Sequence, residues 1–132
     1  MSDKSRRVSD WLADIRESIA NIYSDMGSLT KQEFTADGKT QRAVIKGLTD
    51  IGEASKMIME LDASLGEKNP QMWQHFKDVY AMRIRLTHLY HRVNLSVVYD
   101  TVQVHLPVFE ALLGSIAQAE APPDGDSQLP QD

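Results

Sequence analysis

The chain has 132 residues, a formal net charge of −5 and no cysteine. Its 42% hydrophobic and 25% charged residues are typical of one globular domain, and the lack of cysteine excludes disulfides, thiolate metal ligands and a cysteine nucleophile. No apolar run approaches the ~20 residues of a membrane span, and the polar N-terminus carries no signal-peptide pattern, so a cytoplasmic location without membrane contact is expected.

The first predicted helix follows from apolar residues at helical spacing. We expect Ser9 to be its N-cap and Gly27 to lie just beyond its end. Its apolar face consists of Leu12, Ile15, Ile19, Ile22, Tyr23 and Met26. A single helical turn is expected at Lys31–Phe34, in the connection that follows.

The second predicted helix begins near Thr40 and ends at Gly66. It contains Gly47 and Gly52, and each glycine inside a helix costs about 1 kcal/mol relative to alanine. Such a pair indicates that a neighbouring helix comes close, which places this helix at the centre of the fold.

The third and fourth helices have clear start signals. Asn69 and Pro70 open the third, because proline is favoured at the first helical position, and Asn94 caps the fourth. Pro107 should kink the fourth helix, since proline lacks a backbone donor. The sequence has no strand alternation, so we predict an all-α antiparallel four-helix bundle.

The chain end is different in composition. From residue 119 it is rich in proline and acidic residues and has no helical periodicity. We therefore predict one helical domain over residues 1–118 and a disordered acidic tail over residues 119–132.

Residues 82–92 are locally basic within this acidic chain. Between His75 and Arg92, only Asp78 opposes a set of four cations: Lys77, Arg83, Arg85 and Arg92. Such a charge reversal suits a phosphate-bearing partner. The same stretch holds Arg83, His88 and Tyr90 in the pattern Arg-x4-His-x-Tyr.

This pattern resembles the motif of the HepT-like proteins of the HEPN superfamily. Residues 41–56 and 93–102 are similar to two further segments of that family, and Leu106-Pro107 falls where it often has the same dipeptide. The resemblance extends from about Ser9 to about Ile116.

The resemblance implies a HEPN-like bundle and the toxin half of a type VII-like toxin–antitoxin pair. Such a toxin is a homodimeric, metal-independent endoribonuclease without a cofactor, whose partner is a minimal nucleotidyltransferase. It implies Arg83 and His88 as catalytic residues and Tyr90 as the site where the partner transfers AMP. Arg85 and Glu53 are expected to support phosphate binding, Glu53 as an ion-pair or hydrogen-bond partner of Arg83.

The residue types suit this chemistry. Histidine can act as base or acid near neutral pH, and arginine binds two phosphate oxygens while keeping its charge. Metal catalysis fits less well, because the motif has no carboxylate. However, residues five apart on a helix point about 140° away from each other. Arg83 and His88 therefore converge only if the helix ends or distorts near Thr87, or if a second subunit contributes.

Two departures from the family pattern leave an alternative to the ribonuclease open. Ile84 stands where relatives carry a polar residue, and Leu89 stands where they usually have glycine. The alternative is a non-catalytic helical module that docks a nucleotidyltransferase. A purely structural helical dimer ranks last, because it leaves the Arg83, His88 and Tyr90 cluster unexplained.

Further assignments concern the core and the remaining polar side chains. Core positions are predicted for Leu48, Ile51, Val79 and Leu112. His75 and His105 are expected to be isolated, surface or half-buried residues. The other tyrosines are expected to lack basic surroundings: Tyr23, Tyr80 and Tyr99.

Overall fold

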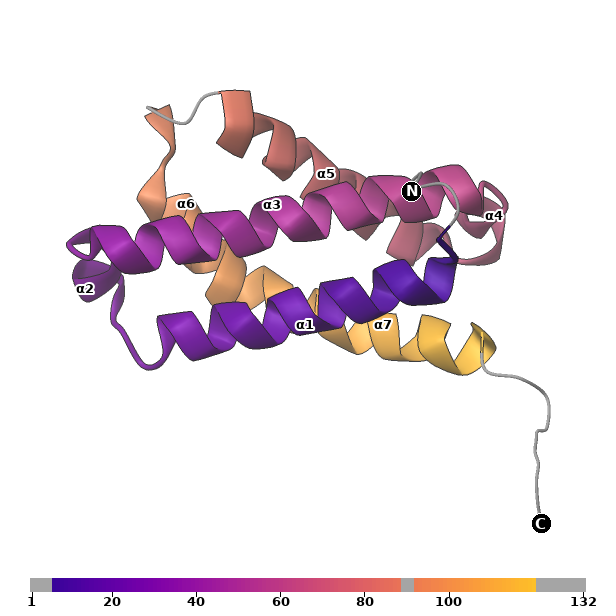
Figure 1. Cartoon of the computed structure of the whole chain (residues 1–132), viewed down its shortest axis with the longest axis horizontal. Helices are drawn as coiled ribbons and strands as arrows, with labels where there is room; N and C mark the ends of the chain where they lie inside the picture. The colour runs from indigo at the N-terminus through magenta and orange to yellow at the C-terminus, as the bar shows by residue number, and fades with distance from the viewer. Residues whose placement is uncertain (1–5, 89–91, 121–132) are drawn as a thin grey trace, which may run out of the picture.

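The computed structural model describes residues 6–88 and 92–120, and the predicted all-α class is confirmed: these residues are almost entirely helical and form no strand (Figure 1). The elements are α1 (Val8–Met26), α2 (Lys31–Thr35), α3 (Gly38–Leu61), α4 (Leu65–Lys68), α5 (Pro70–His88), α6 (Leu95–Asp100), the π-helix η3 (Thr101–His105) and α7 (Leu106–Glu120).

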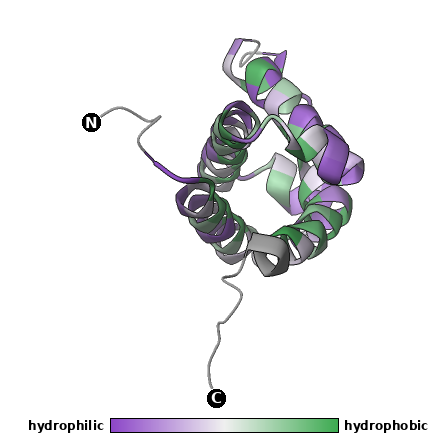
Figure 2. Ribbon diagram, turned by 90° about the vertical axis from the view of Figure 1, so that its right-hand side faces the viewer, coloured by the Kyte–Doolittle hydropathy of each residue, from purple (hydrophilic) through white to green (hydrophobic). Residues whose placement is uncertain are grey.

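The long helices form an antiparallel bundle. In Figure 1, α3 lies between α1 and α5, and it packs against both. The fourth member is composite, because α6, η3 and α7 follow one another without a break. Figure 2 views the bundle end-on and shows the helices around one common axis, with hydrophobic and hydrophilic residues alternating along them. This is the amphipathic pattern of helices that each bury one face.

The start of α1 corrects one prediction. The N-cap is Arg7 rather than Ser9, and the helix begins at Val8. The reason is local: the Asp10 carboxylate accepts a hydrogen bond from the Arg7 backbone N–H at 2.9 Å, which satisfies an amide that the helix leaves unpaired. At the other end, Gly27 has φ of 54° and terminates α1 as predicted.

The end of α3 corrects a second prediction. The helix stops at Leu61, and Gly66 lies inside the short helix α4 instead of ending α3. A Cβ at Gly66 would lie 3.3 Å from Cδ2 of Trp73, so this glycine lets α4 pack on the Trp73 ring. At the start of α3, the Thr40 backbone N–H and hydroxyl donate to the Asp37 carboxylate, and these bonds lower the pKa of Asp37.

The glycines of α3 lie where neighbouring helices come close, as predicted. A Cβ at Gly47 would lie 2.9 Å from Cδ1 of Ile22 on α1. A Cβ at Gly52 would overlap Cβ of Arg83 on α5 and would lie 2.9 Å from the Val79 carbonyl oxygen. The absence of a side chain at Gly52 thus sets the separation of α3 and α5.

The caps of the later helices follow the predictions. Asn69 Oδ1 accepts from the Met72 N–H, and Asn94 Oδ1 accepts from the Val97 N–H, each at 3.2 Å. Before Pro107, the chain widens into the π-helix η3, in which the Leu106 N–H bonds to the Thr101 carbonyl. The distortion predicted at Pro107 is thus a widened turn, consistent with the missing proline donor.

The core contains residues from every long helix. Its largest fully buried side chains include the following: Phe34, Phe76, Phe109, Ile15, Ile19, Ile22, Ile51 and Ile58. Leu48 and Ile51 are buried as predicted, whereas Val79 and Leu112 are only partly buried. Val79 is partly exposed because it lines an open cavity between α5 and α7.

The predicted tail stays a prediction. Its first two residues, 119 and 120, belong to α7, and the remainder lies outside the described residues. Within the described part of the chain, no helix is both long enough and apolar enough to cross a membrane.

Candidate functional site

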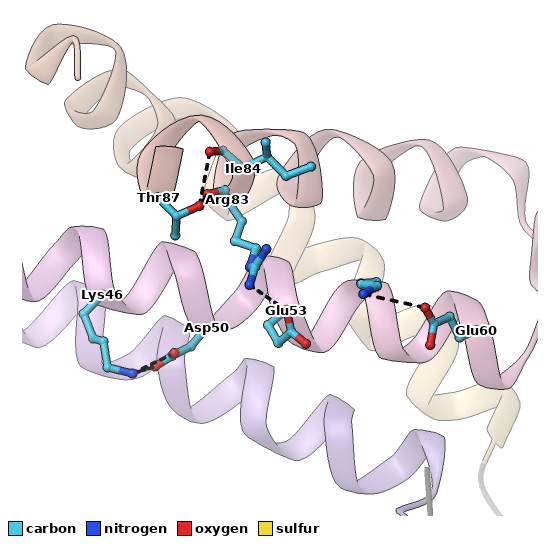
Figure 3. Close-up of polar contacts among 8 residues, drawn as sticks. Lys46, Asp50, Glu53, Glu60, Arg83, Ile84 and Thr87 are labelled. Carbon is cyan, nitrogen blue, oxygen red and sulfur yellow. Dashed lines mark hydrogen bonds and ion pairs between the residues drawn. The ribbon is translucent and has the colours of Figure 1, made fainter. Parts of the chain in front are cut away.

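Arg83 lies on the flank of α5 that faces α3. Its Cβ sits against Gly52, and its Nη2 atom lies 3.2 Å from Oε1 of Glu53 (Figure 3). The predicted pairing of Glu53 with Arg83 is therefore confirmed. Glycine at 52 is what allows the arginine to approach the carboxylate one position further along α3.

This ion pair contributes little to the stability of the fold. The Arg83 and Glu53 side chains are 29% and 37% exposed, and pairs with this much solvent access stabilise a fold by less than about 1 kcal/mol. Arg83 Nε is buried without a hydrogen-bond partner among the described residues, and Cζ lies 5.9 Å from the Tyr80 ring centroid. The aliphatic part of Arg83 thus lies against Gly52, and its guanidinium lies near Glu53 and Tyr80.

His88 is the last residue of α5 and is exposed. The residues that follow His88 in the motif lie outside the described part of the chain, so convergence of the motif stays a prediction. The Thr87 hydroxyl donates to the Arg83 carbonyl at 2.9 Å and lies 3.2 Å from that of Ile84. In the described part of the chain, no hydrogen bond or ion pair joins His88 to Arg83. Tyr90, the predicted modification site, lies outside the described residues.

Arg85 faces a different part of the molecule from Arg83. Side chains two residues apart on a helix are rotated by about 200° around the helix axis, so they point to nearly opposite sides. Accordingly, Arg83 contacts α3, whereas Arg85 lines a cavity together with Thr101 and His105 of η3. The structure does not bring Arg85 to the Arg83–Glu53 pair within one chain.

Two histidines that the sequence treats as isolated lie at one cavity. His75 of α5 and His105 of η3 both line it, and the His75 ring lies 6.4 Å from the Phe109 ring. The only sequence signal was the helical spacing of His75, Val79 and Met82, which places them on one face of α5. No signal indicated that η3 covers that face.

The surroundings of two tyrosines correct a further expectation. Lys56 and Arg83 approach the Tyr80 ring to 5.8 and 5.9 Å, and Lys31 lies 6.0 Å from the Tyr99 ring. Tyr80 and Tyr99 therefore do have cationic neighbours: Lys31 and Lys56 reach them from other helices, and Arg83 lies one turn after Tyr80 on α5. No cluster of three or more potential metal-ligating side chains occurs among the residues described.

The fold and the motif define a small all-α bundle with a cationic site at the C-terminal end of its third long helix. The chain belongs to the HepT-like ribonuclease family: the family model described as "Ribonuclease HepT-like" matches residues 15–116. This match includes all of α3 and α5, most of α1 and α7, and the motif from Arg83 to Tyr90.

Named relatives agree with this assignment. The chain is 35% identical over 102 residues to "Probable ribonuclease HepT" of Thermococcus cleftensis, covering 77% of this chain and 88% of that protein. It is also 35% identical over 100 residues to "Putative RNase MJ0127" of Methanocaldococcus jannaschii, covering 76% and 78%. No solved structure matches the chain significantly.

Proposed function

We propose that this chain is a ribonuclease toxin of a toxin–antitoxin pair, which cleaves RNA without a metal through Arg83 and His88. One observation carries the proposal. The family match spans the motif, and the motif arginine is the residue that packs on Gly52 and pairs with Glu53. An arginine fixed in this way suits a transition state that gains negative charge.

In this proposal His88 transfers protons and Arg83 stabilises the negative charge of the transition state. A histidine takes the proton of the RNA 2′-hydroxyl, whose oxygen attacks the adjacent phosphorus. A protonated histidine donates a proton to the departing 5′ oxygen, so the bond to that oxygen breaks without a metal. Arg83 stabilises the charge on the phosphate oxygens, and Glu53 positions Arg83.

We propose that the active form is a homodimer. One His88 cannot hold both protonation states at once, whereas two copies supply a base and an acid. The C-terminal end of α5 stands out from the rest of the bundle in both Figure 1 and Figure 2, so a partner can reach it. A two-fold dimer would bring two Arg83 and two His88 side chains to one groove.

One observation favours the second candidate function, a non-catalytic module that docks a nucleotidyltransferase. Ile84 points away from α3 in Figure 3 and is 38% exposed, directly beside Arg83 in sequence. An exposed isoleucine suits a protein contact better than it suits RNA. Catalysis and docking predict different outcomes for the removal of His88.

The decisive experiment expresses the chain without its partner. We expect growth arrest that His88→Ala relieves, and cleavage of RNA by the purified protein in the presence of a chelator. Loss of a catalytic acid or base should lower the cleavage rate by about 10²–10⁴-fold.

The matched control is Lys39→Ala, which removes an exposed cation of α3 that does not belong to the basic set between His75 and Arg92. It should remain toxic and active. Absence of cleavage by the wild-type chain, or equal cleavage by wild type and His88→Ala, would leave the docking module as the better function.

We further propose that AMP transfer to Tyr90 silences the site. Tyr90 follows His88 by two residues, so a nucleotide there adds bulk and a negative charge next to the catalytic residues. Arginines that pair with the adduct are no longer available to RNA.

Peptide mass mapping tests this proposal after incubation with ATP and a minimal nucleotidyltransferase, the class of protein proposed as the partner. The AMP mass is expected on Tyr90 and is expected to disappear in Tyr90→Phe. Tyr80, which has Lys56 and Arg83 nearby, is the informative comparison. AMP found on Tyr80 and not on Tyr90 would refute the assignment.

A further inference from the structure

A second site lies on the flank of α5 away from Arg83. It is an open cavity of about 300 Å³ between α5, η3 and α7. Its walls are largely apolar and include Leu48, Val79, Leu106 and Phe109. Neither Arg83 nor His88 lines it, so the cavity is separate from the proposed catalytic residues.

The polar side chains that line this cavity are mostly positively charged or neutral. Arg85, His75, His105 and Asp78 line it. Arg85 makes no hydrogen bond or ion pair with any other described residue, whereas the Asp78 carboxylate accepts a hydrogen bond from the Gln74 amide at 2.9 Å. An unpaired arginine beside an apolar wall, in a chain of net charge −5, favours an anionic ligand.

The backbone beside the cavity is itself unusual. Thr101 and His105 begin and end the π-helix η3, and both line the cavity. Pro107 follows two residues later and cannot donate a backbone hydrogen bond. The widened turn therefore sets how these two side chains face α5, and π-turns inside helices often occur at functional sites.

We propose that this cavity binds a nucleoside monophosphate unit, either as a free mononucleotide or as one nucleotide of an RNA strand. The volume is at the lower limit for small-ligand sites, which suits one base. The base would pack between the aliphatic wall and the rings of Phe109 and His75. The phosphate would reach Arg85 and His105. The proposal concerns binding alone, so no bond is made or broken.

The test uses the full-length protein carrying His88→Ala, so that its outcome does not depend on cleavage. Isothermal titration with AMP, adenosine and inorganic phosphate should show the highest affinity for AMP, because only AMP uses both the apolar wall and Arg85. Arg85→Ala should weaken AMP binding about tenfold or more, the loss expected for a charge-assisted hydrogen bond. Thr101→Phe, which places a ring at the cavity edge, should weaken AMP and adenosine alike.

The matched control is Arg42→Ala, an exposed arginine on α3 that does not line this cavity, and its AMP affinity should be unchanged. A short oligoadenylate distinguishes the two forms of the ligand. If it binds more tightly than AMP, the cavity takes a nucleotide within an RNA strand; if it binds more weakly, the cavity takes a free mononucleotide.

Three results would overturn the proposal. They are no AMP binding at millimolar concentration, an equal loss in Arg42→Ala, and dissociation of a dimer by Arg85→Ala, which would make the cavity a contact between two copies. Each variant is first checked by circular dichroism for a folded, helical chain. Because cleavage is measured separately on the chain with His88 intact, failure of this site and failure of the ribonuclease proposal remain distinguishable.

Discussion

Gly52→Ala is expected to destabilise the protein by about 2–3 kcal/mol and to lower its Tm by roughly 10 °C. The new methyl group would overlap Cβ of Arg83 and lie 2.9 Å from the Val79 carbonyl oxygen. Both neighbours are close to the backbone of α5 and cannot turn aside as the end of a side chain can. The helices α3 and α5 must therefore separate, which also displaces Arg83 from Glu53.

The chain offers a matched control for this substitution. Gly114 lies in α7, is exposed, and has nothing within 4 Å of the position a Cβ would take. Gly114→Ala should therefore stabilise the protein by about 0.5–1 kcal/mol, since alanine favours the helix. Thermal melting by circular dichroism compares the two. If Gly52→Ala melts as high as Gly114→Ala, the close approach of α3 and α5 is wrong.

Ile51→Ala and His88→Ala should have opposite effects on stability and activity. Ile51 is 0% exposed in the core, where truncation to alanine costs about 2–5 kcal/mol. His88 is exposed at the end of α5, so its removal should change the free energy of unfolding by no more than about 0.5 kcal/mol. In RNA cleavage, His88→Ala should lose activity, whereas Ile51→Ala should retain it.

The cleavage assay is run at a temperature at which the Ile51→Ala variant remains folded by circular dichroism. This condition separates the loss of a catalytic group from the loss of the fold. A His88→Ala variant that melts as low as Ile51→Ala would show that His88 is structural, and the catalytic assignment would fail.

The sequence by itself determined which segments are helical and where most of them begin. The caps at Asn69 and Asn94 and the end at Gly27 were predicted correctly, because each depends on hydrogen bonds or backbone angles within a few residues. Ser9 and Gly66 were assigned wrongly although they carry similar local signals. At Ser9 a competing hydrogen bond prevailed, which the Arg7 backbone N–H donates to the Asp10 carboxylate. At Gly66 packing against Trp73 decided the role of the glycine.

The sequence also determined one contact of the candidate site. Gly52 indicated a close helix neighbour, and Glu53 beside it was the expected partner of Arg83. Helical geometry could further have shown that Arg83 and Arg85 face different flanks, since side chains two residues apart are rotated by about 200° around the helix axis. The opposite orientation of Arg83 and Arg85 depends only on spacing along one helix, which the sequence gives directly.

Only the tertiary structure decided which helix faces meet. His75 and His105 are thirty positions apart, and they share a cavity because α7 packs against α5 and the preceding η3 lines the same cavity as His75. For the same reason Val79 became a cavity wall instead of a core residue. Helical periodicity determines which side chains share a face. The rotation and separation of packed helices depend on how distant side chains fill the space between them, which no local pattern encodes.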